Sequence, residues 1–262
     1  MPPLAIQVDW SVVGARIFSP DGDFARALWT TVSVAILSQA IGVLLGLVSA
    51  LAGLSRYRLV RALSAAYVLV IRGTPLIVQI FFVYFGANLF LGFDLFPREV
   101  GLGGVLVSGA IIAGIVALAI NEGAYMSEII RAGIAAVDPG QMESALSVGM
   151  TRRLALRRIV LPQAARFIVP PLGNEFNGMI KNTSLLAFIG VYEMFFDAEA
   201  HYSTTFQPVE YFLSVACWYL LLTTLWGLVQ ARIEARLNRD DFPVPSSLGE
   251  RLRKRLQPAG AR

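Results

Sequence analysis

The chain has 262 residues and the composition of an integral membrane protein. Hydrophobic residues make up 56% and charged residues 15%, against about 25% charged residues in soluble domains, and the mean hydropathy is +0.62. This composition excludes an ordinary soluble domain. The net charge of +4 does not indicate nucleic-acid binding, because the basic residues lie beside the ends of apolar segments. The single cysteine, Cys217, excludes an internal disulfide.

The first 26 residues lack the marks of a signal peptide. Residues 1–26 have no basic start followed by an apolar core and a small-residue cleavage site. An uncharged apolar run follows and predicts a first membrane span over residues 27–54. Since a span needs about 20 apolar residues, this run is long enough to tilt or to protrude from the bilayer.

The second predicted span, 63–91, contains a break. Arg72-Gly73-Thr74-Pro75 interrupts it, and Gly with Pro predicts a kink within one crossing rather than two crossings. The third predicted span is 104–122, and its helix is expected to continue to Ile134.

Two further segments complete a predicted set of five spans. The fourth, 165–180, is weakly hydrophobic, because Pro170, Pro171 and three polar side chains interrupt it. A hydropathy window is expected to miss it. The fifth, 211–229, is continuously apolar.

Basic residues gather on one side of these spans. The loops after spans 1 and 3 and the segment after span 5 are rich in arginine, whereas the 191–209 loop has three acidic residues and no lysine or arginine. The positive-inside rule therefore places the N-terminal segment 1–26 outside and the C-terminus in the cytoplasm. The predicted fold class is an all-α integral membrane protein with five transmembrane helices. A membrane domain, 27–236, precedes a basic cytoplasmic tail, 237–262, for which a topology anchor is favoured over lipid binding.

The loop between spans 3 and 4, residues 138–162, is long, basic and helix-like. Its start, Asp138-Pro139-Gly140-Gln141, predicts a helix with Asp as N-cap, Pro at N1 and Gln at N3 in a capping box. Gly149 predicts a left-handed end of that helix. Thr151 is expected to cap a second short helix, and Pro162 to stop it before the fourth span.

Two short helices joined by a glycine turn suit docking into a groove on another protein. The arginines equally suit a helix lying on an anionic bilayer surface, and periodicity alone favours neither interpretation. The spacing decides for docking. The loop matches the pattern E-A-A-x3-G-x9-I-x-L-P at Glu143, Ala145, Gly149, Ile159, Leu161 and Pro162, with Ser144 in place of the first alanine. It therefore resembles the coupling loop of ABC importer permeases, and these residues are the predicted ATPase contacts.

The resemblance extends over nearly half of the chain. Residues 72–86 (RGTPLIVQIFFVYFG), 124–140 (AYMSEIIRAGIAAVDPG) and 171–193 (with GNEF, KNTSL and IGVYE) are similar to the same segments of permeases for polar amino acids. The chain resembles a permease subunit of the histidine/glutamate/glutamine/arginine/opine group of ABC importers.

The resemblance implies a type I ABC importer permease fold in the bacterial cytoplasmic (inner) membrane, surrounded by lipid. It also implies protein partners: a second permease subunit, identical or homologous, two ABC ATPase subunits, and an extracytoplasmic binding protein that delivers the amino acid. ATP and Mg are expected in the ATPase subunits, because this chain has no G-x4-G-K-[ST] phosphate loop. The chain itself is expected to be no enzyme, with no cofactor, catalytic residue or metal site, and no nucleic-acid partner.

Polar residues within the predicted spans are candidates for the substrate path, because a charge in the membrane normally faces a cavity or a partner. They are Arg72, Asn121, Glu122, Asn174, Glu175, Lys181, Asn182 and Thr183. A zwitterionic amino acid needs a cation for its carboxylate, for which Arg72 and Lys181 are candidates. It also needs an acceptor for its ammonium group, for which Glu122 and Glu175 are candidates. The alternative is mutual pairing, such as Arg72 with Glu122 or Glu175, which would hold the helices in register.

Two other function classes are alternatives to an importer subunit. An ion-coupled secondary transporter is the alternative function, but such proteins usually have more spans and inverted repeats, and the sequence shows no repeat. An intramembrane enzyme would need a catalytic constellation, and none is visible. The only histidine, His201, is predicted to be a surface residue of the 191–209 loop.

Overall fold

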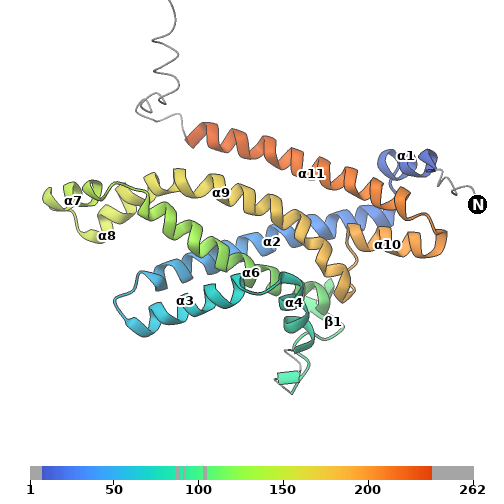
Figure 1. Ribbon diagram of the computed structural model, residues 1–262, viewed down its shortest axis with the longest axis horizontal. Helices are drawn as coiled ribbons and strands as arrows, with labels where there is room; N and C mark the ends of the chain where they lie inside the picture. The colour runs from blue at the N-terminus through green and yellow to red at the C-terminus, as the bar shows by residue number, and fades with distance from the viewer. Residues whose placement is uncertain (1–7, 87–88, 91, 103–104, 238–262) are drawn as a thin grey trace, which may run out of the picture.

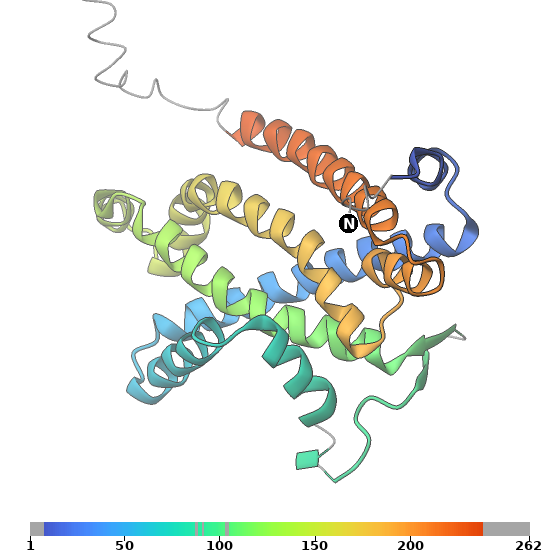
Figure 2. The same cartoon turned by 45° about the vertical axis from the view of Figure 1, so that its right-hand side comes forward.

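The computed structural model shows a bundle of long helices (Figure 1). It describes residues 8–86, 89–90, 92–102 and 105–237, so the predicted tail lies outside the described residues beyond residue 237. The long helices are α2 (Gly22–Gly53), α6 (Gly109–Ala135), α9 (Leu161–Asn182) and α11 (Pro208–Leu237). Two short helices, α7 (Pro139–Ser147) and α8 (Arg152–Ala155), project at one end of the bundle (Figures 1 and 2).

The membrane-spanning helices agree in part with the sequence prediction. Three helices, α2, α6 and α11, are long and apolar enough to span a membrane, and a bent helix pair is a fourth candidate. The predicted fourth span, 165–180, lies within α9, which is not among these candidates in the described part of the chain. The helix is weakly hydrophobic because it contains Pro170 and Pro171 and several polar side chains. The all-helical membrane fold is thus observed, with three to four candidate spans.

The close approach of α2 and α6 forms the centre of the bundle. A Cβ atom added at Gly46 of α2 would lie 2.4 Å from Cβ of Met126 on α6, and one added at Gly42 would lie 2.6 Å from Cβ of Glu122. Small residues allow helix backbones to approach closely in membranes, where packing rather than water exclusion drives association. The two glycines therefore set the spacing of α2 and α6.

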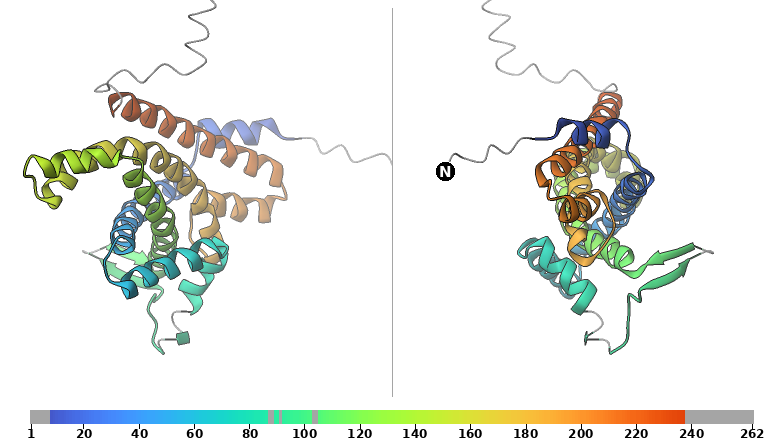
Figure 3. Two further views of the ribbon diagram at one scale, coloured as in Figure 1. Left: turned by 60° about the vertical axis from the view of Figure 1, so that its left-hand side comes forward. Right: turned by 90° about the vertical axis from the view of Figure 1, so that its right-hand side faces the viewer.

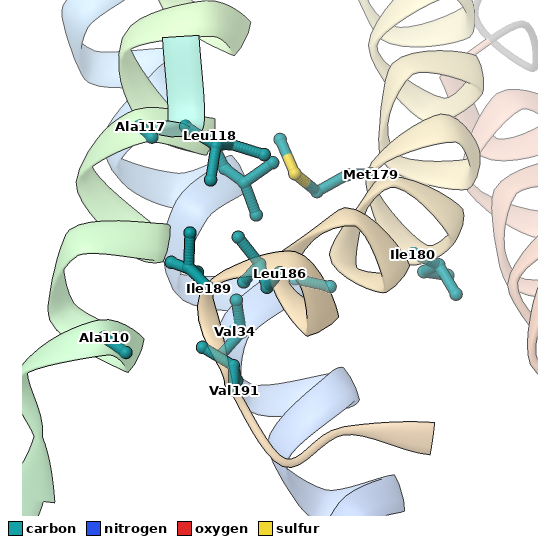
Figure 4. Close-up of a cluster of buried hydrophobic side chains, with 11 residues drawn as sticks. Val34, Ala110, Ala117, Leu118, Met179, Ile180, Leu186, Ile189 and Val191 are labelled. Carbon is teal, nitrogen blue, oxygen red and sulfur yellow. The ribbon is translucent and has the colours of Figure 1, made fainter. Parts of the chain in front are cut away.

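A cluster of buried apolar side chains fills the space between α2, α6, α9 and the 3-10 helix η3 (Thr183–Ile189). Figure 4 shows Leu118 of α6, Met179 of α9 and Leu186 and Ile189 of η3 converging next to Val34 of α2. These contacts join α9, which contains the predicted fourth span, to α2 and α6. Since α9 contributes buried side chains to this cluster, it is an integral part of the bundle.

The bent pair consists of α3 (Arg58–Arg72) and α4 (Leu76–Phe81), which continues as one π-helical turn, η1 (Phe82–Gly86). The two parts meet at an angle of 109°, which confirms the predicted break at 72–75. The break frees backbone carbonyls, and Gln79 satisfies two of them. Its Nε2 donates to the carbonyl oxygens of Ile71 at 2.7 Å and Thr74 at 3.1 Å. Its Oε1 accepts from Nδ2 of Asn121 on α6 at 2.9 Å.

A short hairpin precedes α6 and corrects the predicted start of span 3. Strands β1 (Glu99–Leu102) and β2 (Val105–Ser108) pair antiparallel, with Val100 opposite Val107. The hairpin projects from the bundle (Figure 3). Alternating valine and leucine residues favour a strand here, and Ser108 then caps α6 through the backbone N–H of Ala110. The span therefore begins at residue 109 rather than 104.

Ion pairs stabilise the end of the bundle that lies opposite α7. These pairs were not predicted from the sequence. A short helix, α1 (Trp10–Phe18), carries Arg16, which forms ion pairs with Asp21 and with the buried Asp197 of α10 (Met194–Thr205). Asp21 also caps α2, and the hydrogen bond from the backbone N–H of Phe24 lowers the pKa of Asp21, because it favours the charged form. These contacts tie α1 to α2 and α10.

The glycine spacing of α2 and α6 yields a first prediction. We expect Gly46→Ala to destabilise the bundle, because its added Cβ would lie 2.4 Å from Met126 and overpacking costs about 1–3 kcal/mol. The usual gain of about 1 kcal/mol when alanine replaces glycine in a helix is too small to offset this. The measurement is the midpoint of thermal unfolding in detergent. Gly227→Ala on α11 is the control, since a Cβ there meets nothing within 4 Å. Equal midpoints for both variants would contradict the packing.

The clamp at the helix break yields a second prediction. Gln79→Leu removes the donor for two backbone carbonyls, so we expect a loss of about 1–3 kcal/mol in stability, the cost of unsatisfied buried polar groups. The same measurement on Asn121→Leu and on the double variant tests the bond between the two amides. If they share it, the double variant loses less than the sum of the single losses. Gln163→Leu, which breaks an exposed glutamine pair, is the control.

Candidate functional site

The coupling loop, residues 138–162, begins as the sequence predicts. The Asp138 carboxylate accepts the backbone N–H of Gly140 at 2.7 Å and caps α7, with Pro139 in the first turn. The predicted capping box is wrong in its second half: Oε1 of Gln141 accepts from Nε2 of Gln163 at 3.1 Å. Because α7 lies against the start of α9, Gln141 has a tertiary partner that competes with its own helix start.

The glycine turn after α7 is confirmed. Gly149 has φ = +86°, a left-handed conformation that favours glycine. Its N–H donates to the Leu146 carbonyl at 3.0 Å, and the N–H of Met150 donates to the Ala145 carbonyl at 3.1 Å, the two bonds of a Schellman motif. Thr151 then caps α8 by accepting the N–H of Leu154 at 3.3 Å. The turn is therefore fixed by local hydrogen bonds at both sides.

Pro162 does not stop the second helix, contrary to the prediction. Helix α8 continues through a π-helical turn, η2 (Leu156–Val160), directly into α9, and the backbone at Ala155, Leu156 and Leu161 is right-handed helical. A proline lacks an N–H and its ring clashes with the carbonyl four residues earlier. The wider π-helical turn just before Pro162 accommodates both effects, so the helix passes through the proline.

Buried apolar side chains attach the coupling loop to the rest of the bundle. Ala145 of α7 and Ala155 of α8 are buried, and Val160 packs with Val137 and Ala164 in one cluster that also includes the half-buried Met142. These contacts fix α7 and α8 on the ends of α6 and α9.

The opposite face of the coupling loop is open. Leu146, Leu154 and Val148 are exposed, the last at 77%, and so are Glu143, Ser144, Leu161, Pro162 and four arginines, Arg152, Arg153, Arg157 and Arg158. Ile159 is half-buried. These exposed side chains give α7, α8 and η2 an apolar patch with a basic rim. The helices that carry it lie at the end of the bundle (Figure 2).

The structure brings together two of the candidate residues of the substrate path. The guanidinium of Arg72 lies 5.2 Å from the ring centroid of Tyr125 on α6. Its positive charge acts on the Glu175 carboxylate of α9, but the two groups form no ion pair within the described residues. Arg72 is exposed and Glu175 half-buried. Arg72, at the break in the second span, therefore contacts α6 and acts on the charge of Glu175 at longer range than an ion pair.

Two neighbouring candidates have partners inside the bundle. Asn121 donates to Gln79, and Oε1 of Glu122 accepts from Nε2 of Gln39 on α2 at 2.8 Å. Glu122 is only 4% exposed. The predicted pairing of Arg72 with Glu122 is therefore not observed, and Gln39 takes the place of the arginine. Since its side chain is buried against α2, Glu122 is a poorer candidate than Glu175 for a ligand contact.

The remaining candidates at the end of α9 are divided between different surroundings. Asn174 is exposed, Asn182 half-buried and Thr183 fully buried, with its hydroxyl donating to the Ile180 carbonyl at 2.7 Å. Lys181 lines a separate cavity of about 470 Å³ between α9, α10 and α11, with Phe195 and Tyr219. Lys181 is thus not grouped with Arg72.

Sequence reasoning missed three side chains that organise this region: Gln39, Gln79 and Tyr125. Gln39 and Gln79 are amides inside otherwise apolar runs, and that signal alone would have marked them as polar groups in need of partners. The position of Tyr125 beneath Arg72 depends on the helix break and is not visible in the sequence.

Comparison with known proteins gives close relatives over most of the chain. It is 43% identical over 197 residues to the nopaline transport system permease protein NocM of Agrobacterium fabrum, covering 75% of this chain and 80% of the relative. It is 38% identical over 238 residues to the L-cystine transport system permease protein TcyB of Bacillus subtilis, covering 90% and 94%.

Solved structures agree with the fold. An amino acid ABC transporter with histidines matches with a TM-score of 0.74 and 37% identity, covering 88% of this chain and all of that chain. The MetNI methionine ABC transporter, at 18% identity and a TM-score of 0.66, shares the fold. Residues 42–239 match the family described as binding-protein-dependent transport system inner membrane component. The coupling loop and the helix break both lie within this match, and the chain belongs to that family of ABC importer permeases.

Proposed function

We propose that the chain is the permease subunit of an ATP-driven importer for a polar amino acid or opine, working with two ATPase subunits and a second permease subunit. Its family is that of inner-membrane permease components that depend on a binding protein, and such a component is not itself an ATPase. The relatives named above are permeases for nopaline and L-cystine. The observation that carries the proposal is the coupling loop: an anchored pair of short helices with an open apolar patch and a basic rim.

The proposed orientation has five spans, with the N-terminus outside and the coupling loop and C-terminus in the cytoplasm. Helix α9 is the proposed fifth span, in addition to the four candidates. It contributes Met179 and Ile180 to the central cluster, so few of its side chains need to be apolar for contact with lipid. The arginines of α8 and η2 lie at the end that this orientation places in the cytoplasm, as the positive-inside rule requires.

The substrate path is proposed to pass between Arg72 and Glu175. The guanidinium offers a bidentate partner for the carboxylate of an amino acid, and the glutamate offers an acceptor for its ammonium group. Tyr125 holds the guanidinium by a cation–π contact. The positive charge of Arg72 attracts the half-buried Glu175 carboxylate, and the two groups form no ion pair in the described chain, so each is left for a ligand.

The coupling loop is tested by Gly149→Asp. An aspartate at φ = +86° strains the turn and puts a charge beside the apolar patch, so we expect the ATPase subunit to be lost on co-purification from membranes in mild detergent. Gly92→Asp is the matched control, because Gly92 has φ = +73°, lies outside the coupling loop and has open space around it. If wild type retains no ATPase under any mild condition, the importer assignment fails and ion-coupled transport by the chain alone is tested next.

The substrate path is tested by Arg72→Gln and Glu175→Gln in the complete importer in liposomes. Each change removes a charge-assisted contact worth about 1.5–3 kcal/mol, so we expect uptake of a radiolabelled amino-acid mixture to fall about tenfold or more. Arg72→Lys is expected to restore little, because lysine lacks the bidentate geometry. Arg26→Gln, at a highly exposed position in the first turns of α2, is the control. Wild-type uptake by both variants would assign the pair a purely structural role.

A further inference from the structure

A cavity of about 610 Å³ lies between α2, α3 and α6, on the coupling-loop side of Arg72. Its walls carry the guanidinium groups of Arg61, Arg72 and Arg131 and a single carboxylate, that of Glu128. Three positive groups against one negative group leave the wall with an excess of positive charge. The candidate substrate path uses only Arg72, so Arg61 and Arg131 have no assigned function.

Helix α3, which carries Arg61 and Arg72, has one polar and one apolar face, as expected of a helix between lipid and a water-filled cavity. Among the fifteen described residues of α3, none is buried. Arg61, Ser64 and Arg72 line the cavity at helical spacing on one face, together with the apolar Ala65, Val68 and Leu69, whereas Leu59 and Leu63 are exposed at 71% and 63% outside it. Ionisable residues at membrane depth face a cavity or a partner, so the polar face of α3 indicates a cavity that admits water.

The arginines are held in place by bonds that use only part of their donors. Nη1 of Arg61 donates to the carbonyl oxygens of Ser55 at 2.9 Å and Arg56 at 3.2 Å, at the end of α2. Nε and Nη2 of Arg131 donate to the two carboxylate oxygens of Glu128 at 3.1 and 2.7 Å. A guanidinium has five N–H donors, and these bonds leave Nε and Nη2 of Arg61 and Nη1 of Arg131 for a ligand.

Serine hydroxyl groups from three helices also line the cavity. Oγ of Ser127 on α6 donates to Oγ of Ser49 on α2 at 3.0 Å, and Oγ of Ser64 on α3 donates to the Ser49 carbonyl at 2.8 Å. The three hydroxyl groups join the three helices around the cavity. With 1.5 Å per residue, Arg61 and Arg72 are about 16 Å apart along α3, so positive groups follow the cavity from the helix break toward the coupling-loop end (Figure 1).

We infer that this cavity is an anion-binding vestibule at the cytoplasmic end of the permease, which takes a carboxylate or phosphate group between Arg61 and Arg131. Two sources supply that chemistry: the carboxylate of the cargo after it passes Arg72, and the phosphate of an anionic lipid headgroup. The cytoplasmic placement rests on the proposed function. Binding of an anion to the arginines does not depend on it, so the two are tested separately.

The test uses the complete importer in nanodiscs of neutral phosphatidylcholine. Phenylglyoxal modifies accessible guanidinium groups, and peptide mass spectrometry reports the rate at each arginine. At matched ionic strength, acetate and inorganic phosphate are compared with chloride. We expect protection of Arg61 and Arg131 by a factor of 1 + [L]/Kd, or about fourfold at about three times the dissociation constant. Arg26 and Arg232, both exposed outside the cavity, serve as internal controls with unchanged rates.

Glu128→Gln separates an anion site from a merely structural cluster. It removes the carboxylate that occupies Arg131, so an anion site gains affinity and the protection of Arg61 by phosphate increases. A structural cluster would loosen, and both arginines would react faster whatever the anion. Glu199→Gln, at an exposed glutamate of α10, is the matched control. Arg131→Gln is expected to weaken protection of Arg61.

Nanodiscs that contain phosphatidylglycerol distinguish the two sources. Protection of Arg61 and Arg131 by this lipid, with no further effect of acetate, assigns the site to a headgroup phosphate. Protection by acetate in both lipid compositions assigns it to a carboxylate of the cargo. The inference is overturned if phosphate, acetate and phosphatidylglycerol all leave the rates unchanged, or if they protect the control arginines equally. Loss of the ATPase from the preparation would contradict the proposed function but not the anion site.

Discussion

The close contact of α2 and α6 at Gly42 and Gly46 is the constraint on which the described bundle depends. It leaves no room for a side chain at either glycine, so the two helices have one spacing and one register. Helices α3, α4 and α9 then each pack on α6. Both groups of candidate functional residues, the coupling loop and the pair of Arg72 with Glu175, are positioned through α6.

Side chains donate to backbone carbonyl groups at two places where proline or glycine interrupts the regular helices. Gln79 supplies donors to the carbonyl groups that the break at 72–75 frees. Trp226 and Gln230 of α11 donate to the carbonyl oxygens of Gly173 and Pro170 on α9, at 2.8 and 3.2 Å. Because a bilayer offers no water to unpaired backbone groups, such partners are required wherever proline or glycine breaks a spanning helix.

Much of this organisation could be predicted from the sequence, because it depends on local signals. The glycine turn at 149 and the break at 72–75 are specified by the special backbone geometry of glycine and proline, and the N-caps by the side-chain oxygens of Asp138 and Thr151. The prediction failed where a partner distant in sequence decides the outcome. Gln141 bonds to Gln163 instead of its own helix start, and Glu122 bonds to Gln39 instead of an arginine.

The hairpin at 99–108 and the helix through Pro162 were missed for a related reason. A short apolar run of valine and leucine fits a strand or the start of a span equally well, and the pairing of β1 with β2 selects the strand. A proline usually ends a helix, yet one π-helical turn is enough to accommodate it. Local rules give the preference of a segment, and packing decides between the alternatives that remain.

The uninterrupted helix from α8 through η2 to α9 has a mechanical consequence. Glu175 lies 23 residues beyond Arg152, which is about 35 Å along the helical path. No break in the helical backbone separates the exposed residues of α8 from Glu175. A partner that shifts Arg152 therefore moves a continuous helix that carries Glu175, and this helix can bend at the π-helical turn 156–160 and at Pro170 and Pro171.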